Sequence, residues 1–208
     1  MSDFLKTKSQ FYIPEGMIYL DGNSLGPLTK TAQDRIQHTL NNEWGEMLVT
    51  GWNKAGWMDQ PNKVGDRIAR LIGAASKTVT VGDTLSIKVF QALASAINYQ
   101  KSRKVLLTDA SNFPSDIYAA QGLINMLKAD HELKIVNTDN LIENINENVA
   151  AIFFTEVDYR TGRRYDAKKI IKTAKQNGAL VILDLAHSAG AIDTNLTELD
   201  VDFAVGCT

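Results

Sequence analysis

From about residue 78 onward, short apolar runs rich in β-branched residues alternate with stretches in which apolar residues recur at helical spacing. This alternation is typical of an α/β fold, in which helices flank a mostly parallel sheet. We therefore expect a doubly wound α/β domain. Its strands are expected at residues 78–81, 104–107, 133–136, 150–154, 179–183 and 202–205, and its helices at residues 85–99, 114–127 and 166–176.

Two further helices are expected ahead of the sheet, at residues 28–43 and 63–72. No linker rich in proline, glycine or serine separates them from the sheet, so they are interpreted as an N-terminal helical arm over residues 1–75. The sheet domain is then expected over residues 76–208. No internal repeat or low-complexity segment interrupts either part.

The charge pattern narrows the class of partner. The formal net charge is −2 and the basic residues are scattered, which argues against nucleic acid and against an anionic membrane surface as partners. No apolar run approaches the length of a membrane span or of a secretory signal. Cys207 is the single cysteine, which favours a reducing cytoplasm, and we expect it to be a small buried residue. No Cys/His spacing indicates a metal site.

An aspartate and a histidine follow the most apolar expected strand. Asp184 comes directly after residues 179–183, and His187 follows three residues later. A carboxylate at the end of a buried strand is costly unless it is paired, so a cationic partner is expected there. Open parallel sheets bind their ligands at this edge. A helix-capping aspartate beside a surface histidine is the alternative.

Two other strand-to-helix loops carry polar residues suited to a ligand. Thr84 and Ser86 place hydroxyls beside the free amides of a helix N-terminus, which can hold a phosphate, although Thr84 as a plain helix cap is an alternative. Phe113 lies at a loop tip, where its ring could cover a planar cofactor, whereas residues 114–116 form an ordinary helix start. In the loop of residues 51–57, two indoles could face an aromatic substrate or pack together.

Taken in order, these segments resemble the kynureninase family of pyridoxal phosphate (PLP) enzymes, which belongs to fold type I, the aspartate aminotransferase-like superfamily. The resemblance runs through nearly the whole chain. It is carried by Y-L-D-G-N-S-L-G-P, G-W-N-K-A-G-W, D-T-L-S, N-F-P-S-D, E-V-D-Y-R-T-G-R, D-L-A-H-S-A-G and V-D-F-A-V-G-C-T. It implies hydrolysis of L-kynurenine to anthranilate and L-alanine in tryptophan catabolism, with 3-hydroxykynurenine as a second candidate substrate. It also implies a homodimer in the complete protein.

The resemblance implies a role for individual residues. Asp184 would pair with the pyridinium nitrogen and His187 would support that pair. Leu85 departs from the hydroxyl residue of many relatives, so it would act through its backbone amide. The remaining implied contacts are Ser86 with the cofactor phosphate, Phe113 stacked on the ring with Pro114, Ser115 and Asp116 completing that wall, Thr155 beside the ring, and Asn23, Ser24 and Trp52 in the substrate pocket.

In the family, the stretch like V-D-F-A-V-G-C-T continues into a tyrosine and the Schiff-base lysine. The sequence in hand is therefore expected to be an incomplete PLP-binding large domain without the small domain, and to be inactive by itself. Another fold type I enzyme, such as a cysteine desulfurase or a class V aminotransferase, is one alternative, which the histidine at position 187 disfavours. A non-catalytic binding or subunit-interaction fragment is the other.

Overall fold

The computed structural model describes residues 3–127 and 130–207. The chain divides into two compact units, Met1–Pro61 and Asn62–Thr208. The boundary expected from the sequence, between an N-terminal arm at residues 1–75 and a sheet domain at residues 76–208, stays a prediction.

The first unit is mostly helical. Thr29 caps its second helix, because its Oγ1 accepts a hydrogen bond from the amide of Ala32 at 3.1 Å. The single helix expected at residues 28–43 is in fact two segments, since the chain passes into a π-helix after α2. The elements are α1 (Asp3–Lys8), α2 (Lys30–His38), the π-helix η1 (Thr39–Glu46), η2 (Leu48–Thr50), α3 (Gly51–Lys54) and η3 (Trp57–Asp59).

A buried carboxylate holds the indole loop of this unit. Glu43 is almost fully buried, and it accepts hydrogen bonds from Arg35 at 2.6 Å and from Nε1 of Trp57 at 2.8 Å. These two bonds hold the pKa of Glu43 below its usual value. Trp57 therefore packs as a structural residue, whereas Trp52, in edge contact with it at 5.7 Å, stays half exposed.

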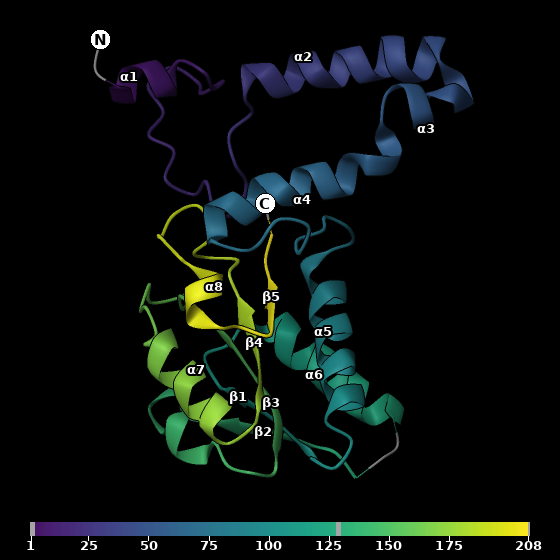
Figure 1. Ribbon diagram of the computed structural model, residues 1–208. Helices are drawn as coiled ribbons and strands as arrows, with labels where there is room; N and C mark the ends of the chain where they lie inside the picture. Colours follow the sequence, from purple (N-terminus) through teal and green to yellow (C-terminus); the bar gives the residue numbers. More distant parts are fainter. Residues whose placement is uncertain (1–2, 128–129, 208) are drawn as a thin grey trace. The chain divides into compact units, whose positions relative to one another are not determined.

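The second unit contains a parallel sheet in the strand order β2-β1-β3-β4-β5 (Figure 1). The α/β fold expected from the sequence is confirmed, and five expected strands agree within two residues at each end. The strands are β1 (Val105–Asp109), β2 (Glu132–Val136), β3 (Val149–Thr155), β4 (Leu180–Asp184) and β5 (Phe203–Val205).

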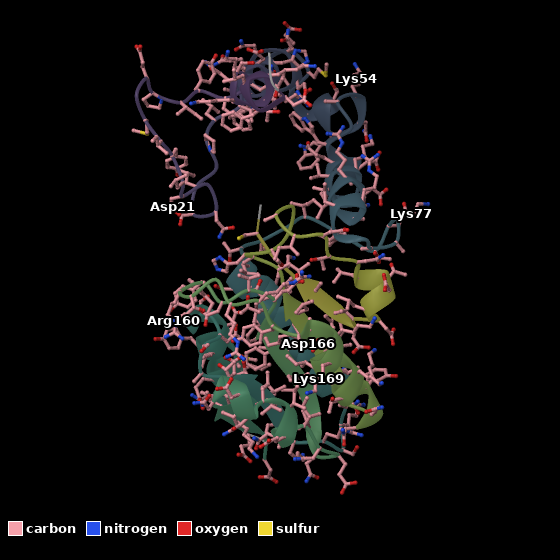
Figure 2. The ribbon with its side chains drawn as sticks, turned by 90° about the vertical axis from the view of Figure 1, so that its left-hand side faces the viewer. Asp21, Lys54, Lys77, Arg160, Asp166 and Lys169 are labelled. Atoms are coloured by element: carbon pink, nitrogen blue, oxygen red, sulfur yellow. The ribbon has the colours of Figure 1, made fainter. Side chains whose placement is uncertain are left out.

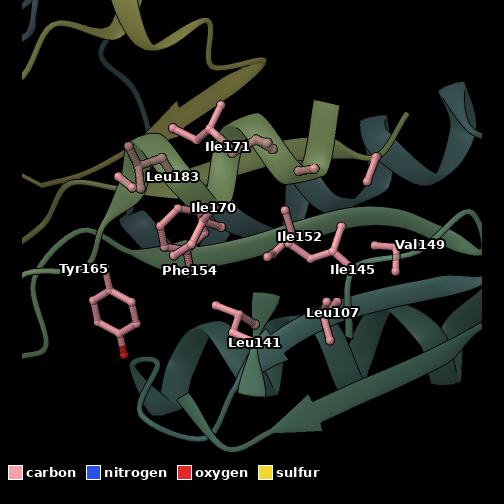
Figure 3. Close-up of a cluster of buried hydrophobic side chains, with 14 of the residues drawn as sticks. Leu107, Leu141, Ile145, Val149, Ile152, Phe154, Tyr165, Ile170, Ile171 and Leu183 are labelled. Atoms are coloured by element: carbon pink, nitrogen blue, oxygen red, sulfur yellow. The ribbon is translucent and has the colours of Figure 1, made fainter. Parts of the chain in front are cut away.

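Helices cover both faces of this sheet (Figure 1). Side chains of successive strand residues point to opposite faces, so Phe154 packs toward α7 while Phe153 packs toward α5 and α6. Figure 3 shows the α7 side, where Ile170 and Ile171 meet the strands. The helices of this unit are α4 (Gln60–Ile72, which begins in the first unit), α5 (Leu85–Tyr99), α6 (Pro114–Leu127), α7 (Ala167–Gln176) and α8 (Leu196–Leu199), with short 3-10 turns at Thr138–Asn140 and Ile142–Asn144.

One expected strand is wrong. Residues 78–81 form no strand, because no other strand among the described residues lies beside them to share backbone hydrogen bonds. This segment packs against α4 instead. The carbonyl of Val79 lies so close to Gly65 that no side chain fits there.

Candidate active site

The carboxyl ends of β3 and β4 bring Thr155 and Asp184 side by side, as partners in the strand register. Asp184 is 3% exposed, since the apolar strand that carries it lies between two helical layers. Its Oδ1 accepts the amide of Ala186 at 2.8 Å, and residues 186–188 form a turn, so Asp184 caps no helix. Its Oδ2 is buried and has no hydrogen-bond partner among the described residues.

The unpartnered oxygen is chemically informative. Burial raises the pKa of Asp184 to about 6, and the bond from Ala186 opposes this shift. A buried carboxylate oxygen is costly without a donor or a positive charge. A protonated pyridine nitrogen supplies both, so the Asp184 carboxylate fits the ring of pyridoxal phosphate.

A second buried carboxylate belongs to this region. Asp116 lies in the first turn of α6 and is 1% exposed. Its pKa is raised to about 7, first by burial and then by the negative charge of Asp184, while a weak hydrogen bond from Ser115 opposes the shift. The sequence indicated Asp116 only as a helix-start residue and, through the resemblance, as part of the cofactor wall.

Hydrogen bonds from the loop before α6 to strand residues fix the backbone at Phe113. Asn112 is buried, and its side chain donates to Thr108 Oγ1 at 3.0 Å while its Oδ1 accepts the amide of Phe113 at 2.8 Å. Thr108 in turn donates to the carbonyl of Phe153 at 2.7 Å. Phe113 itself remains 37% exposed, so a large apolar ring is available at the loop tip, as the sequence suggested.

Three rings meet at this point, and we call Phe113, Tyr159 and His187 the aromatic cluster. The ring centroids of Phe113 and Tyr159 are 4.9 Å apart in an edge-to-face contact. His187 lies 6.3 Å from Phe113 and 6.2 Å from Tyr159. The structure therefore brings two of the residues expected to bind a cofactor, Phe113 and His187, into one group with a third aromatic residue.

Two residues of this region were missed in the sequence. Tyr159 and Glu156 both lie in the motif E-V-D-Y-R-T-G-R, but the sequence assigned neither of them a role. Glu156, which follows β3, is 1% exposed and accepts hydrogen bonds from Arg164 at 3.1 Å and from Thr194 at 2.8 Å. The signal that could have found Glu156 is the same one that singled out Asp184, a carboxylate directly after an apolar strand. Thr155 uses its own hydroxyl within the chain, donating to the carbonyl of Val157 at 2.9 Å.

The N-terminus of α5 carries Leu85 and Ser86 in its first turn. Thr84 occupies the capping position, but its side chain makes no capping hydrogen bond. The alternative of a plain threonine cap is thus not realised, and the Thr84 side chain leaves the first amides of this helix available to an anion. Ser86 is exposed and Leu85 half-buried.

An apolar groove of about 810 Å³ runs between residues 79–85 and β5. Leu85 lines this groove, whereas Asp184 and the aromatic cluster do not. The groove is therefore distinct from the region around Asp184 and the aromatic cluster. Cys207 also lines it and is exposed, so the expectation of a buried cysteine is wrong. Its neighbours in β5 lie at the sheet edge, where no described strand covers them.

The expected substrate residues lie in the first unit. Asn23 and Ser24 belong to an exposed turn, in which the amide of Ser24 donates to the carbonyl of Asp21 at 3.2 Å. Trp52 is 51% exposed on α3. Their roles toward a substrate stay predictions. Among residues 3–127 and 130–207, no cluster of histidine, cysteine and acidic residues could hold a metal ion, and no helix is long and apolar enough to cross a membrane.

Comparison with known proteins gives consistent results. The model of the aminotransferase class-V family matches residues 18–207. The sequence is 44% identical to a kynureninase of Burkholderia mallei and 42% identical to one of Pseudomonas fluorescens, in each case over 97% of this chain and 50% of the relative. The chain thus spans about half the length of the curated relatives it matches.

Solved structures agree on the fold. The cysteine desulfurase CsdA of Escherichia coli superposes with a TM-score of 0.80 at 15% identity, over 99% of this chain and 54% of that one. A cysteine desulfurase of Thermococcus onnurineus NA1 superposes with a TM-score of 0.77 at 17% identity, over 99% and 53%. At such low identity, this likeness concerns the fold alone.

Proposed function

Because the chain belongs to the aminotransferase class-V family, which depends on pyridoxal phosphate, we propose that it forms the cofactor-binding part of a kynureninase-like hydrolase. The reaction would be cleavage of L-kynurenine, with 3-hydroxykynurenine as a second candidate, to anthranilate and L-alanine. The observation that carries the proposal is the buried Asp184 carboxylate, whose Oδ2 has no partner among the described residues.

Different residues would bind the ring nitrogen, the ring face and the phosphate of the cofactor. Asp184 would hold a proton on the ring nitrogen through its Oδ2, and Phe113 would cover one face of the ring. The first amides of α5, at Leu85 and Ser86, would bind the phosphate. When bound, pyridoxal phosphate supplies an electron sink for the pair left when a bond to the substrate α-carbon breaks. The charge of Asp184 would support that sink by keeping the ring nitrogen protonated.

A kynureninase-like activity is preferred over a cysteine desulfurase activity because the relatives at 42–44% identity are kynureninases, whereas the desulfurases share only 15–17%. Trp52 would contact the aryl group of the substrate, and Asn23 and Ser24 would line the same pocket. A homodimer is proposed for the complete protein, and the single cysteine supports a cytoplasmic location.

Binding of pyridoxine 5′-phosphate tests the cofactor part of this proposal. This compound keeps the ring and the phosphate but has no aldehyde, so its binding does not depend on any lysine. We expect the 208-residue chain to bind it, and Asp184→Ala to weaken binding roughly tenfold or more through loss of a charged hydrogen bond. Asp193→Ala, which removes an exposed carboxylate from the same loop region, is the control and should bind like the wild type.

A further inference from the structure

Tyr159 contacts both other members of the aromatic cluster. Its ring contacts Phe113 edge to face at 4.9 Å, with an interplanar angle of 68°, and lies 6.2 Å from the ring of His187. The proposed function gives Phe113 a role toward the cofactor, and the family resemblance implies a supporting role for His187. Edge-to-face pairs at such distances are favourable and restrict how each ring can turn.

The backbone that carries Tyr159 is fixed by local hydrogen bonds. Oδ1 of Asp158, a buried carboxylate, accepts the amides of Arg160 at 2.7 Å and Thr161 at 3.0 Å. The amide of Gly162 closes the turn onto the carbonyl of Asp158 at 2.9 Å, and the φ angle of Gly162 is 70°, which glycine adopts without strain. The turn therefore presents Tyr159 on a rigid base.

The turn that carries Tyr159 lies in a short hairpin, residues 157–164, whose two ends make contacts beyond the turn. Val157 and Arg164 pair across it in an antiparallel bridge. Arg164 also donates to the buried Glu156, which binds Thr194 in the segment after Asp184. The hairpin thus keeps a fixed relation to the loop that carries His187.

A cation lies over the Tyr159 ring. The guanidinium carbon of Arg160 is 5.5 Å from the ring centroid, and one of its nitrogens is 3.9 Å from the Asp158 carboxylate. Figure 2 labels Arg160 at the surface of the second unit, where its side chain is 52% exposed. Tyr159 is therefore held by contacts on several sides although it is 40% exposed.

We propose that Tyr159 is a positioning residue, which holds the rings of Phe113 and His187 in the arrangement that receives the cofactor. Phe113 lies at a loop tip and is 37% exposed. Without the ring contact from Tyr159, its side chain would exchange between rotamers. If the Phe113 side chain is already ordered before the ligand binds, binding does not have to offset the entropy lost by fixing its rotamer. The inference rests on the proposed function, because the benefit appears only if a planar cofactor stacks on Phe113.

The test uses two measurements on the 208-residue chain. The first follows the ring-proton resonances of Phe113 and His187 by NMR without ligand, and the second measures affinity for pyridoxine 5′-phosphate. Tyr159→Ala should displace both sets of resonances and weaken binding roughly 3- to 10-fold. Tyr159→Phe, which keeps the ring, should restore both. Tyr118→Ala removes a tyrosine that is 73% exposed on α6 and should change neither.

A double substitution separates positioning from direct contact. If Tyr159 acts through Phe113, then Tyr159→Ala should cost little further affinity in a Phe113→Ala background. Unchanged ring resonances in Tyr159→Ala, or displaced resonances with unchanged affinity, would overturn the inference. Full additivity of the two substitutions would also overturn it. A wild-type chain that fails to bind pyridoxine 5′-phosphate would instead refute the proposed function, and the inference with it.

Discussion

The negative charge of Asp184 contributes to the raised pKa of Asp116, so an ionised Asp184 disfavours ionisation of Asp116. Each is at most 3% exposed, and burial is the largest cause of both shifts. A cationic ligand between or beside the two carboxylates would offset the free-energy cost of ionising them in a buried position. The pair therefore destabilises the ligand-free protein in a way that a bound cofactor can offset.

The first prediction is that stability falls with rising pH. The folded-state pKa values of about 6 and about 7 lie above the ordinary value of 3.8. Between about pH 4 and pH 7 the folded state thus holds protons that the unfolded state has lost, so the free energy of unfolding decreases as pH rises. In thermal melts of the ligand-free chain, Asp116→Asn should be more stabilising relative to wild type at about pH 8 than at about pH 5. An equal difference at both pH values would contradict the assignment.

Phe113→Ala should weaken cofactor binding. The phenyl ring is available at a loop tip, and an aromatic stack contributes about 0.5–1.5 kcal/mol beyond area burial, which corresponds to roughly 2- to 10-fold in affinity. Titration with pyridoxine 5′-phosphate measures the change. Tyr118→Ala on the adjoining helix α6 serves as the control. An unaltered dissociation constant would assign Phe113 to packing alone.

Glu156→Gln should destabilise the chain by about 1–3 kcal/mol, because Glu156 is fully buried and satisfies both Arg164 and Thr194. Asp139→Asn is the matched control, since it breaks an exposed ion pair with Arg163 and should cost less than about 0.5 kcal/mol. Urea unfolding at neutral pH compares the two. Equal, small losses would show that the buried pairing contributes little.

Trp52→Ala should raise the Michaelis constant for kynurenine more than it lowers turnover, the pattern of lost ground-state binding. The assay uses residues 1–208 joined to the half of the Burkholderia mallei kynureninase that this chain does not cover. Trp44→Ala removes another exposed indole of the same unit and is the control. A purely turnover effect would place Trp52 outside the substrate pocket.

Much of the fold could be predicted from the sequence, because local signals coincide with the final elements. Pro114 begins α6, and apolar spacing marks residues 85–99 as α5. The strand expected at residues 78–81 failed because a strand depends on a neighbour that local sequence does not reveal. The same holds for the site. Asp184 was found from its own strand, whereas the contact of Phe113 with Tyr159 joins residues far apart in sequence.

The central claim is that this chain forms the cofactor-binding part of a kynureninase-like hydrolase. Its most direct test is product release by the protein in which residues 1–208 are joined to the uncovered half of the Burkholderia mallei kynureninase. We expect it to release fluorescent anthranilate from L-kynurenine, with sulfide release from cysteine at background. Asp184→Asn should keep the cofactor but lose activity on the order of 100-fold or more, because an amide cannot hold the ring nitrogen protonated. Sulfide release from cysteine without anthranilate, or near wild-type activity of Asp184→Asn, would contradict the account.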